Sequence, residues 1–310
     1  MRTTTLSSSS GPIEVSRLAY GAMRIAGTWN PDEITPERRA AAYASLQAAY
    51  DAGYTLFDHA DIYCRGGCEQ LHGDFLKEHS ELRGQTVIAT KCGIRFKGDP
   101  EGAVGRYDFS SSHIIWSCER SLERLGVDQI DLYQLHRPDL LMNPEEVAEA
   151  FAKLHSAGKV KAFGVSNFLP STVTLLQKWL SFPISVNQIE VSLWRLDPFL
   201  DGTLDQCIRE SIVPLSWGPV GGGRVGKEHE QGTTGIEPLS EALADVAKAH
   251  GSEPATIAFA WLLKHPSGIV PIVGSTNPAR IRAAVDSLSV DLSREDWYRL
   301  LVAARGEAMP

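Results

Sequence analysis

The segment "IDLYQLHRPDLLMNPEEVAEAFAKLHSAGKVKAFGVSNF", Ile130 to Phe168, decides the fold class, because it contains a strand, a helix and a second strand. The runs at residues 130–136 and 160–166 are short, apolar and rich in strand-forming residues. Between them lies a stretch with apolar residues at helical spacing, which begins at Pro144 and ends at Gly158. A strand that returns through a helix predicts a parallel strand pair.

The same alternation runs along the whole chain. Strands are expected at 17–23, 55–59, 86–92, 130–136, 160–166, 185–191, 212–217 and 269–274. Helices are expected after them at 36–52, 68–79, 111–125, 144–157, 170–180, 203–210, 238–250 and 278–287. Thr35, Asn143 and Asn277 each precede an N1 proline and are expected helix caps, and Gly53 sits at an expected helix end.

Eight such units, with strands that are apolar on both faces, predict an α/β fold that closes as a (β/α)8 TIM barrel. Two additional helices, at 254–265 and 293–304, do not fit the plain alternation. A short N-terminal hairpin completes the expected architecture. No linker-like segment divides the chain, so residues 1–310 are expected to form a single domain.

Composition narrows the classes of partner. The 310 residues include 30 Lys and Arg against 38 Asp and Glu, a net charge of -8 without runs of like charge, so no nucleic-acid or anionic-membrane partner is expected. No apolar stretch has the length of a signal peptide or a membrane span, which favours a cytoplasmic protein. The five cysteines are odd in number and irregularly spaced, as is typical of reduced thiols that fill the core.

In a barrel of this kind the functional groups lie at the carboxyl ends of the strands. Four titratable side chains are expected there on three consecutive strands. Asp58 ends the second strand and Tyr63 lies just beyond it, Lys91 ends the third strand, and His136 ends the fourth. Each of them taken alone has an ordinary structural explanation, but together on one rim they favour a catalytic site.

The later strands end in polar and aromatic groups. Ser166 and Asn167 follow the fifth strand, Gln188 lies on the sixth and Trp217 ends the seventh. The eighth strand ends in "GSTNPAR", 274–280, where free backbone N–H groups open a helix and an arginine follows in its first turn. This pattern predicts an anion site.

The motifs "FDHADIY", "ATKCG", "LHRPD", "GVSNF", "NQIEVS", "GGGR" and "PIVGSTNPARIR" lie in this order at the expected strand ends. In these motifs the chain resembles the aldo/keto reductases, NADPH-using barrels that reduce carbonyl compounds. Within that family it looks most like the bacterial YdhF-type oxidoreductases. The resemblance covers nearly the whole chain.

The resemblance implies a catalytic tetrad of Asp58, Tyr63, Lys91 and His136. Tyr63 would donate the proton that a reduced carbonyl needs, although a free phenol is a weak donor at neutral pH. The ammonium of Lys91 would lower the pKa of Tyr63, and Asp58 would keep Lys91 charged and in place. His136 would orient the carbonyl oxygen or relay the proton.

The resemblance also implies a nicotinamide cofactor, NADPH in preference to NADH, and a small-molecule carbonyl substrate. Trp217 is the expected stacking partner of the nicotinamide, and Arg280 with the loop before it is the expected site of the 2′-phosphate. Gly274 stands where many relatives have a lysine, which keeps NADH open as the alternative. The full set of expected cofactor contacts is Gly21, Met23, Ser166, Asn167, Gln188, Trp217, Gly218, Val220, Gly223, Arg224, Gly274, Ser275, Thr276, Asn277 and Arg280.

Several alternatives stay open. Cys64, Cys68 and His72 are spaced so that a zinc site, and hence a metal-dependent hydrolase barrel, is conceivable, but the first strand ends without the histidines that such a barrel would need, so no metal is expected. The chain could also be a cofactor-binding, redox-sensing subunit with little turnover, and it is expected to be a monomer or a small homo-oligomer. The segment "GGGRVG", 221–226, matches a dinucleotide fingerprint, but a loop follows it, so a flap over the cofactor is expected instead. The roles of His59 and Asp61 are undecided.

Overall fold

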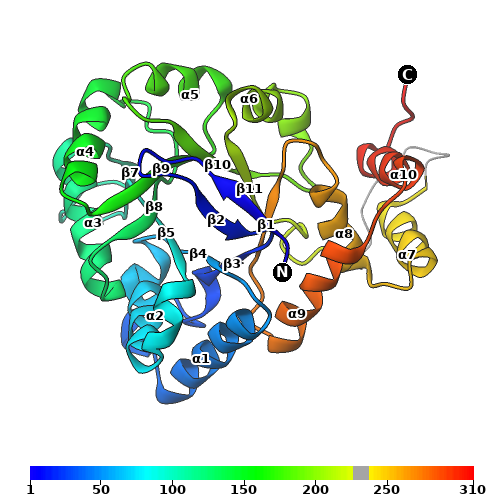
Figure 1. Cartoon of the computed structure of the whole chain (residues 1–310), viewed down its shortest axis with the longest axis horizontal. Helices are drawn as coiled ribbons and strands as arrows, with labels where there is room; N and C mark the ends of the chain where they lie inside the picture. Colours follow the sequence, from blue (N-terminus) through cyan, green and yellow to red (C-terminus); the bar gives the residue numbers. More distant parts are fainter. Residues whose placement is uncertain (226–236) are drawn as a thin grey trace.

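Eight parallel strands close into a barrel in a computed structural model that describes residues 1–225 and 237–310. Around the barrel the order is β10-β11-β12-β3-β4-β5-β8-β9, and Figure 1 looks along its axis. The barrel strands are β3 (Ala19–Gly21), β4 (Leu56–Asp58), β5 (Val87–Cys92), β8 (Ile130–Leu135), β9 (Val160–Ser166), β10 (Ile184–Glu190), β11 (Val213–Trp217) and β12 (Val270–Val273). The predicted (β/α)8 TIM barrel is confirmed.

Ten α-helices lie in the described ranges. They are α1 (Pro36–Asp51), α2 (Gly67–Glu78), α3 (Ser111–Leu125), α4 (Pro144–Ser156), α5 (Pro170–Gln177), α6 (Thr203–Glu210), α7 (Leu239–Ala249), α8 (Pro254–Leu263), α9 (Pro278–Ala283) and α10 (Arg294–Arg305). Shorter 3-10 turns include η3 (Tyr63–Gly66), η4 (Ser80–Gln85) and η6 (Ala284–Ser289). The expected helix at 278–287 is thus divided between α9 and η6.

The predicted helix signals act as expected. The side chains of Thr35, Asn143 and Asn277 each accept a hydrogen bond from a backbone N–H in the first turn of the helix that follows. Gly53 and Gly158 have φ values of 84° and 70°, in the left-handed region that helix ends require. Local sequence therefore sets where α1 and α4 begin and end.

The assignment of the additional helices needs one correction. The segment 254–265 was expected to be extra, but α8 packs directly against β12. It takes the position between α6 and α9 in the ring of helices around the barrel (Figure 1). The outlying pair is α7 with α10, which pack on each other at the right of Figure 1. The reason lies in the sequence of α8, "PATIAFAWLL", which is apolar around its whole circumference, as in a helix that is covered on all sides.

The N-terminal hairpin consists of β1 (Thr3–Leu6) and β2 (Ile13–Ser16), paired antiparallel. Leu6 and Val15 are fully buried and pack with barrel residues such as Leu132 and Val186. The hairpin lies across the barrel in Figure 1 and covers the amino ends of the strands, which leaves the carboxyl ends for function.

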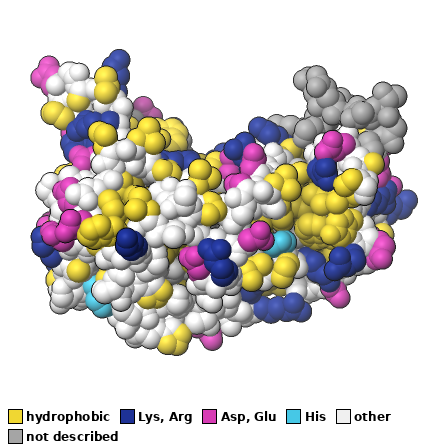
Figure 2. All heavy atoms as spheres, turned by 90° about the horizontal axis from the view of Figure 1, so that it is seen from above, with side chains coloured by type: hydrophobic (Ala, Val, Ile, Leu, Met, Phe, Trp, Pro, Cys, Tyr) yellow, Lys and Arg dark blue, Asp and Glu magenta, His cyan; other side chains and the backbone are white. Residues whose placement is uncertain are grey.

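Two further features lie on the loops. A small hairpin, β6 (Ile94–Arg95) with β7 (Arg106–Tyr107), follows β5 and was not predicted. Most of the segment expected to act as a flap lies at 226–236, outside the described residues. Figure 2 shows one face on which acidic and basic side chains are interspersed with apolar ones.

All five cysteines are buried as free thiols, in keeping with the expectation that they fill the core. None of the helices in the described ranges is long and apolar enough to span a bilayer.

Candidate active site

The four predicted catalytic side chains meet at the carboxyl rim of neighbouring strands. Asp58 is the last residue of β4, where it pairs with Gly21 of β3 and Ala89 of β5. Lys91 lies on β5 opposite Gln134 of β8. Tyr63 opens η3 after β4, and His136 directly follows β8. The parallel register therefore brings strand ends that are far apart in sequence to one edge.

Lys91 stands at the centre of this group. Its side chain is only 1% exposed, and its Nζ donates hydrogen bonds to Asp58 Oδ1 at 2.7 Å, to the His59 carbonyl at 2.6 Å and to the Tyr63 hydroxyl at 3.4 Å. The three donors of an ammonium group are thus all used. A buried charge needs such a set of partners to offset the cost of leaving water.

Asp58 is held from its other side as well. Its Oδ2 accepts a hydrogen bond from Gln188 Nε2 at 3.1 Å, across the barrel from β10. Gln188 was expected to contact the cofactor, and its bond to Asp58 was not foreseen. Its free Oε1 is buried without a partner among the described residues. Gln188 thus combines the support of Asp58 with one unused acceptor.

The charges of the group follow from burial and from mutual attraction. Burial works to lower the pKa of Lys91, but the carboxylate of Asp58 and the hydroxyl of Tyr63 outweigh it, so the pKa of Lys91 lies above its ordinary value. Lys91 is therefore an ammonium at neutral pH.

Tyr63 shows the opposite balance. Burial raises its pKa, and although Lys91 and Arg137 work to lower it, the pKa stays above that of a free phenol. Lys91 lowers the pKa of Tyr63 as expected, but burial raises that pKa by more than Lys91 lowers it. Tyr63 is therefore held in its protonated form at neutral pH.

His136 lies beside Tyr63, with ring centroids 5.8 Å apart and planes at 81°. Burial, together with the positive charges of Lys91 and Arg137, holds its pKa well below the ordinary value. The ring is therefore neutral at physiological pH. Its Nδ1 is buried and has no hydrogen-bond partner among the described residues, so His136 keeps one ring nitrogen for a ligand.

Trp217 lies at the end of β11, where its Nε1 donates a hydrogen bond to Asn167 Oδ1 at 2.9 Å. Asn167 in turn donates to Ser166 Oγ at 2.7 Å, and Ser166 donates to the Gln188 carbonyl at 2.9 Å. Asn167 has a φ of 59°, which is uncommon for a residue other than glycine. Both ends of its amide are engaged, so Asn167 fixes the orientation of the indole.

The guanidinium of Arg137 lies 5.2 Å from the centre of the Trp217 ring, within the range of a cation–π contact. No carboxylate among the described residues forms an ion pair with Arg137. Arg137 was not predicted as a site residue, although its place directly after His136 is a signal that could have found it. The barrel mouth thus carries a positive charge next to Tyr63 and His136.

The loop after β12 lies next to this group along the rim, because Val273 pairs with Tyr20 of β3. The carbonyls of Ser275 and Thr276 accept hydrogen bonds from the hydroxyls of Tyr20 and Ser45. These bonds attach the loop to β3 and α1, while Gly274, Thr276 and Asn277 remain exposed to solvent. Arg280 is exposed and has no ion-pair partner among the described residues, so its guanidinium is available to an anion.

The other predicted contacts surround these two regions. Gly21 ends β3 in close contact with β12, since a Cβ there would come within 2.7 Å of Ile272. The turns that follow β11 contain four of them, Gly218, Val220, Gly223 and Arg224. Met23 lies in the 3-10 turn after β3.

The residues present fit a nicotinamide nucleotide. The oriented indole of Trp217 offers a stacking surface, and the unpartnered Gln188 Oε1 and His136 Nδ1 offer buried polar contacts. An exposed arginine stands further along the same rim. Gln134 was not predicted as a site residue, but it also lies buried on β8, and neither its Nε2 nor its Oε1 has a partner among the described residues.

The zinc alternative gains no support from the geometry. His72 is engaged by His59 and Tyr50, and Cys68 Sγ contacts the Met23 carbonyl at 3.6 Å. Within residues 1–225 and 237–310, no group of three His, Cys, Asp or Glu side chains is arranged so that it could hold a metal ion.

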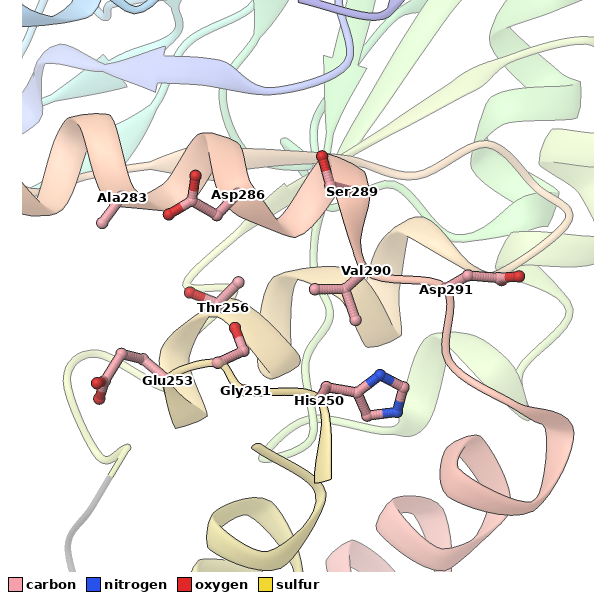
Figure 3. Close-up of a pocket in the computed structure, with 10 residues that line it drawn as sticks. His250, Gly251, Glu253, Thr256, Ala283, Asp286, Ser289, Val290 and Asp291 are labelled. Atoms are coloured by element: carbon pink, nitrogen blue, oxygen red, sulfur yellow. The ribbon is translucent and has the colours of Figure 1, made fainter. Parts of the chain in front are cut away.

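A separate cavity of about 580 Å³ lies outside this site, between the start of α8 and the segment after η6 (Figure 3). Three acidic side chains, Glu253, Asp286 and Asp291, and His250 contribute to its lining. None of the predicted site residues lines it.

Comparisons with known proteins agree with this architecture. Residues 17–302 match the model of the Aldo/keto reductase family. The chain is 39% identical over 301 residues to Oxidoreductase YdhF of Escherichia coli (strain K12), with 97% of each chain covered. It is 40% identical over 304 residues to a 6-dehydroglucose reductase of Novosphingobium aromaticivorans, covering 96% of this chain and 94% of the relative. The solved structure of the thermostable aldo-keto reductase Tm1743 is 25% identical, with a TM-score of 0.83, and covers 98% of this chain and 100% of that one.

Proposed function

The chain belongs to the aldo/keto reductase family, and on that premise we propose that it is an NADPH-dependent oxidoreductase that reduces aldehydes or ketones to alcohols. One observation supports the proposal most. The ammonium of Lys91 lies between Asp58, at 2.7 Å, and the hydroxyl of Tyr63, at 3.4 Å. A buried lysine that contacts both a carboxylate and a phenol is suited to proton transfer at that phenol.

Tyr63 is the proposed proton donor. Its raised pKa keeps the phenol protonated at neutral pH, where it can give its proton to the oxygen of a carbonyl that is being reduced. The phenolate left behind lies next to the Lys91 ammonium, which stabilises the negative charge. Asp58 keeps that ammonium charged. The neutral ring of His136 can donate a hydrogen bond to the carbonyl oxygen and so hold it near Tyr63.

The cofactor, when bound, supplies the hydride that adds to the carbonyl carbon. The proposal assigns Trp217 to the face of the nicotinamide, with Asn167 holding the indole in place. Ser166 and Gln188 are assigned to the carboxamide, and the unpartnered Gln188 Oε1 is suited to accept from an amide N–H. The remaining predicted contacts stay as proposals of the same kind.

NADPH is preferred over NADH because of Arg280. Its exposed guanidinium has no carboxylate partner among the described residues, and the planar fork of donors matches the oxygens of a 2′-phosphate. Replacing Arg280 with Gln should weaken NADPH binding and leave NADH binding unchanged. If the variant bound NADPH and NADH equally more weakly, Arg280 would not be the residue that recognises the 2′-phosphate.

The substrate is proposed to be a small carbonyl compound, and sugar-derived aldehydes are the first to test because a relative at 40% identity is a 6-dehydroglucose reductase. The proposal also includes a cytoplasmic location and a monomer or small homo-oligomer.

The proposal is tested by following NADPH consumption by the purified protein against a panel of aldehydes, ketones and sugar aldehydes. We expect saturable turnover with at least one of them and formation of the alcohol. NADPH binding without turnover on any substrate would favour the redox-sensing alternative. Neither binding nor turnover would overturn the reductase assignment.

A further inference from the structure

A chain of buried hydrogen bonds runs outward from the residue next to Asp58. His59 Nε2 lies 2.8 Å from His72 Nδ1 on α2, and His72 Nε2 lies 2.9 Å from the hydroxyl of Tyr50 on α1. The Tyr50 hydroxyl lies 2.8 Å from Thr86 Oγ1, which donates to the Leu82 carbonyl at 2.7 Å. Both histidines are 0% exposed. Neither histidine takes part in the proposed proton transfer.

The far end of this chain fixes the direction of every bond in it. A carbonyl can only accept, so the single hydroxyl hydrogen of Thr86 points to Leu82. Thr86 therefore accepts from Tyr50, and the Tyr50 oxygen accepts from His72 Nε2–H. A neutral His72 then has a bare Nδ1, which accepts from the Nε2–H of His59.

Both rings are neutral for physical reasons. Burial, together with the influence of His72 and the charge of Lys91, holds the pKa of His59 well below its ordinary value. Burial and the charge of Arg83 lower the pKa of His72 to about 3. The direction of the bonds then leaves His59 Nδ1 as a bare acceptor, and this atom is indeed buried without a partner among the described residues.

At its inner end this hydrogen-bond chain reaches Lys91 through the backbone carbonyl of His59. The carbonyl of His59 accepts from Lys91 Nζ at 2.6 Å, the shortest of the three bonds that the ammonium makes. The N–H of His59 donates to the Ala89 carbonyl on β5 at 2.8 Å. His59 is thus tied to the barrel by its backbone and to α2 by its ring.

The geometry points to His59 and His72 as positioning residues for the proposed reaction. Their hydrogen bond anchors the His59 carbonyl, which directs the Lys91 ammonium toward the hydroxyl of Tyr63. The inference rests on the proposed function, in which Lys91 stabilises the Tyr63 phenolate. Small displacements of such a group are costly, because proton transfer and charge stabilisation both depend on its distance from the phenol.

The first test uses the intact wild-type protein and needs no activity. Nitrogen NMR of labelled histidine distinguishes the two neutral tautomers and the protonated form. We expect His59 and His72 to be neutral with hydrogen on Nε2, and both to stay neutral at pH 5. A hydrogen on Nδ1 of either ring, or protonation at pH 5, would overturn the inference whatever the enzyme catalyses.

The second test replaces His72 with Phe, which keeps an aromatic ring but accepts no hydrogen bond from His59. We expect kcat to fall about tenfold, with the Kd for NADPH unchanged. The alkaline limb of the pH profile should move to higher pH, because a displaced Lys91 no longer lowers the pKa of Tyr63. His72→Asn, whose Oδ1 restores an acceptor near the position of Nδ1, should recover most of kcat.

Tyr133→Phe is the matched control. It removes another buried tyrosine hydroxyl, which donates to the Ile114 carbonyl at 3.0 Å and is not part of this chain. We expect some loss of stability and no shift of the pH profile. A folded His72→Phe variant with the pH profile and kcat of the wild type would overturn the inference. An inactive wild type would instead overturn the proposed function and leave the tautomer test to decide on the hydrogen-bond chain.

Discussion

Replacing Asp58 with Asn should both destabilise the protein and nearly abolish turnover. Asn keeps the shape of the side chain and an oxygen that can accept from Gln188, but it removes the negative charge 2.7 Å from Lys91 Nζ. Lys91 is then a fully buried cation whose burial is no longer offset, so its pKa falls.

The distance sets the size of the effect. At 2.7 Å, and with an effective dielectric constant of about 20, the attraction between the two charges is about 6 kcal/mol. Part of that loss is avoided when Lys91 releases its proton, so we expect a destabilisation of about 3–5 kcal/mol. Because a neutral Lys91 no longer stabilises the Tyr63 phenolate, kcat should fall by at least about 100-fold.

The assay is a double-mutant cycle with Asp58→Asn, Lys91→Met and the double variant, each measured by urea unfolding and by turnover. Each single variant should be strongly destabilised, since it leaves one buried charge unpaired. The double variant should recover most of the stability, because two neutral side chains need no pairing, yet it should stay inactive.

The cycle refutes the reasoning if the two single losses simply add in the double variant. Additive losses would mean that Asp58 and Lys91 are not coupled, and that their short contact contributes nothing beyond packing.

Three further predictions concern other parts of the site. Arg137→Gln removes a charge that lowers the pKa of Tyr63, so the alkaline fall in kcat for reduction should move to higher pH; an unmoved limb would contradict the electrostatic link. Asn167→Ala frees the indole of Trp217 and should raise the Kd for NADPH about tenfold in a fluorescence titration. Asn167→Gly, which suits the left-handed backbone, should weaken binding equally, and an effect in the Ala variant alone would point to backbone strain. Burial raises the pKa of Asp61 to about 7 from 3.8, so stability should fall as pH rises from about 4 to 7. In urea unfolding, the free energy of unfolding of Asp61→Asn should therefore exceed that of the wild type by about 4 kcal/mol at pH 8 and by less at pH 5. A difference in unfolding free energy that does not change with pH would contradict this.

Much of the fold could be predicted because its signals are local. Apolar runs and caps such as Thr35 and Asn143 act within a few residues of themselves, and the eight units follow from them. The place of α8 was missed because strict alternation was given more weight than its apolar circumference. The hairpin of β6 and β7 was missed because its strands are only two residues long.

The functional site could likewise be predicted only in part. Motifs predicted which residues reach the rim, but not which of them bond to each other. The contact of Gln188 with Asp58 joins residues 130 positions apart and depends on the closure of the barrel. The hydrogen bond between His59 and His72 depends on how α2 packs against β4, which spacing along the chain does not fix.

The most direct test of the proposed function compares Tyr63→Phe with the wild type, using NADPH and the best carbonyl substrate found. The variant removes only the hydroxyl beside Lys91. We expect the Kd for NADPH to stay within about twofold and kcat to fall by at least about 100-fold, since the proton donor is lost. Turnover near that of the wild type would contradict the assignment of Tyr63 as the proton donor.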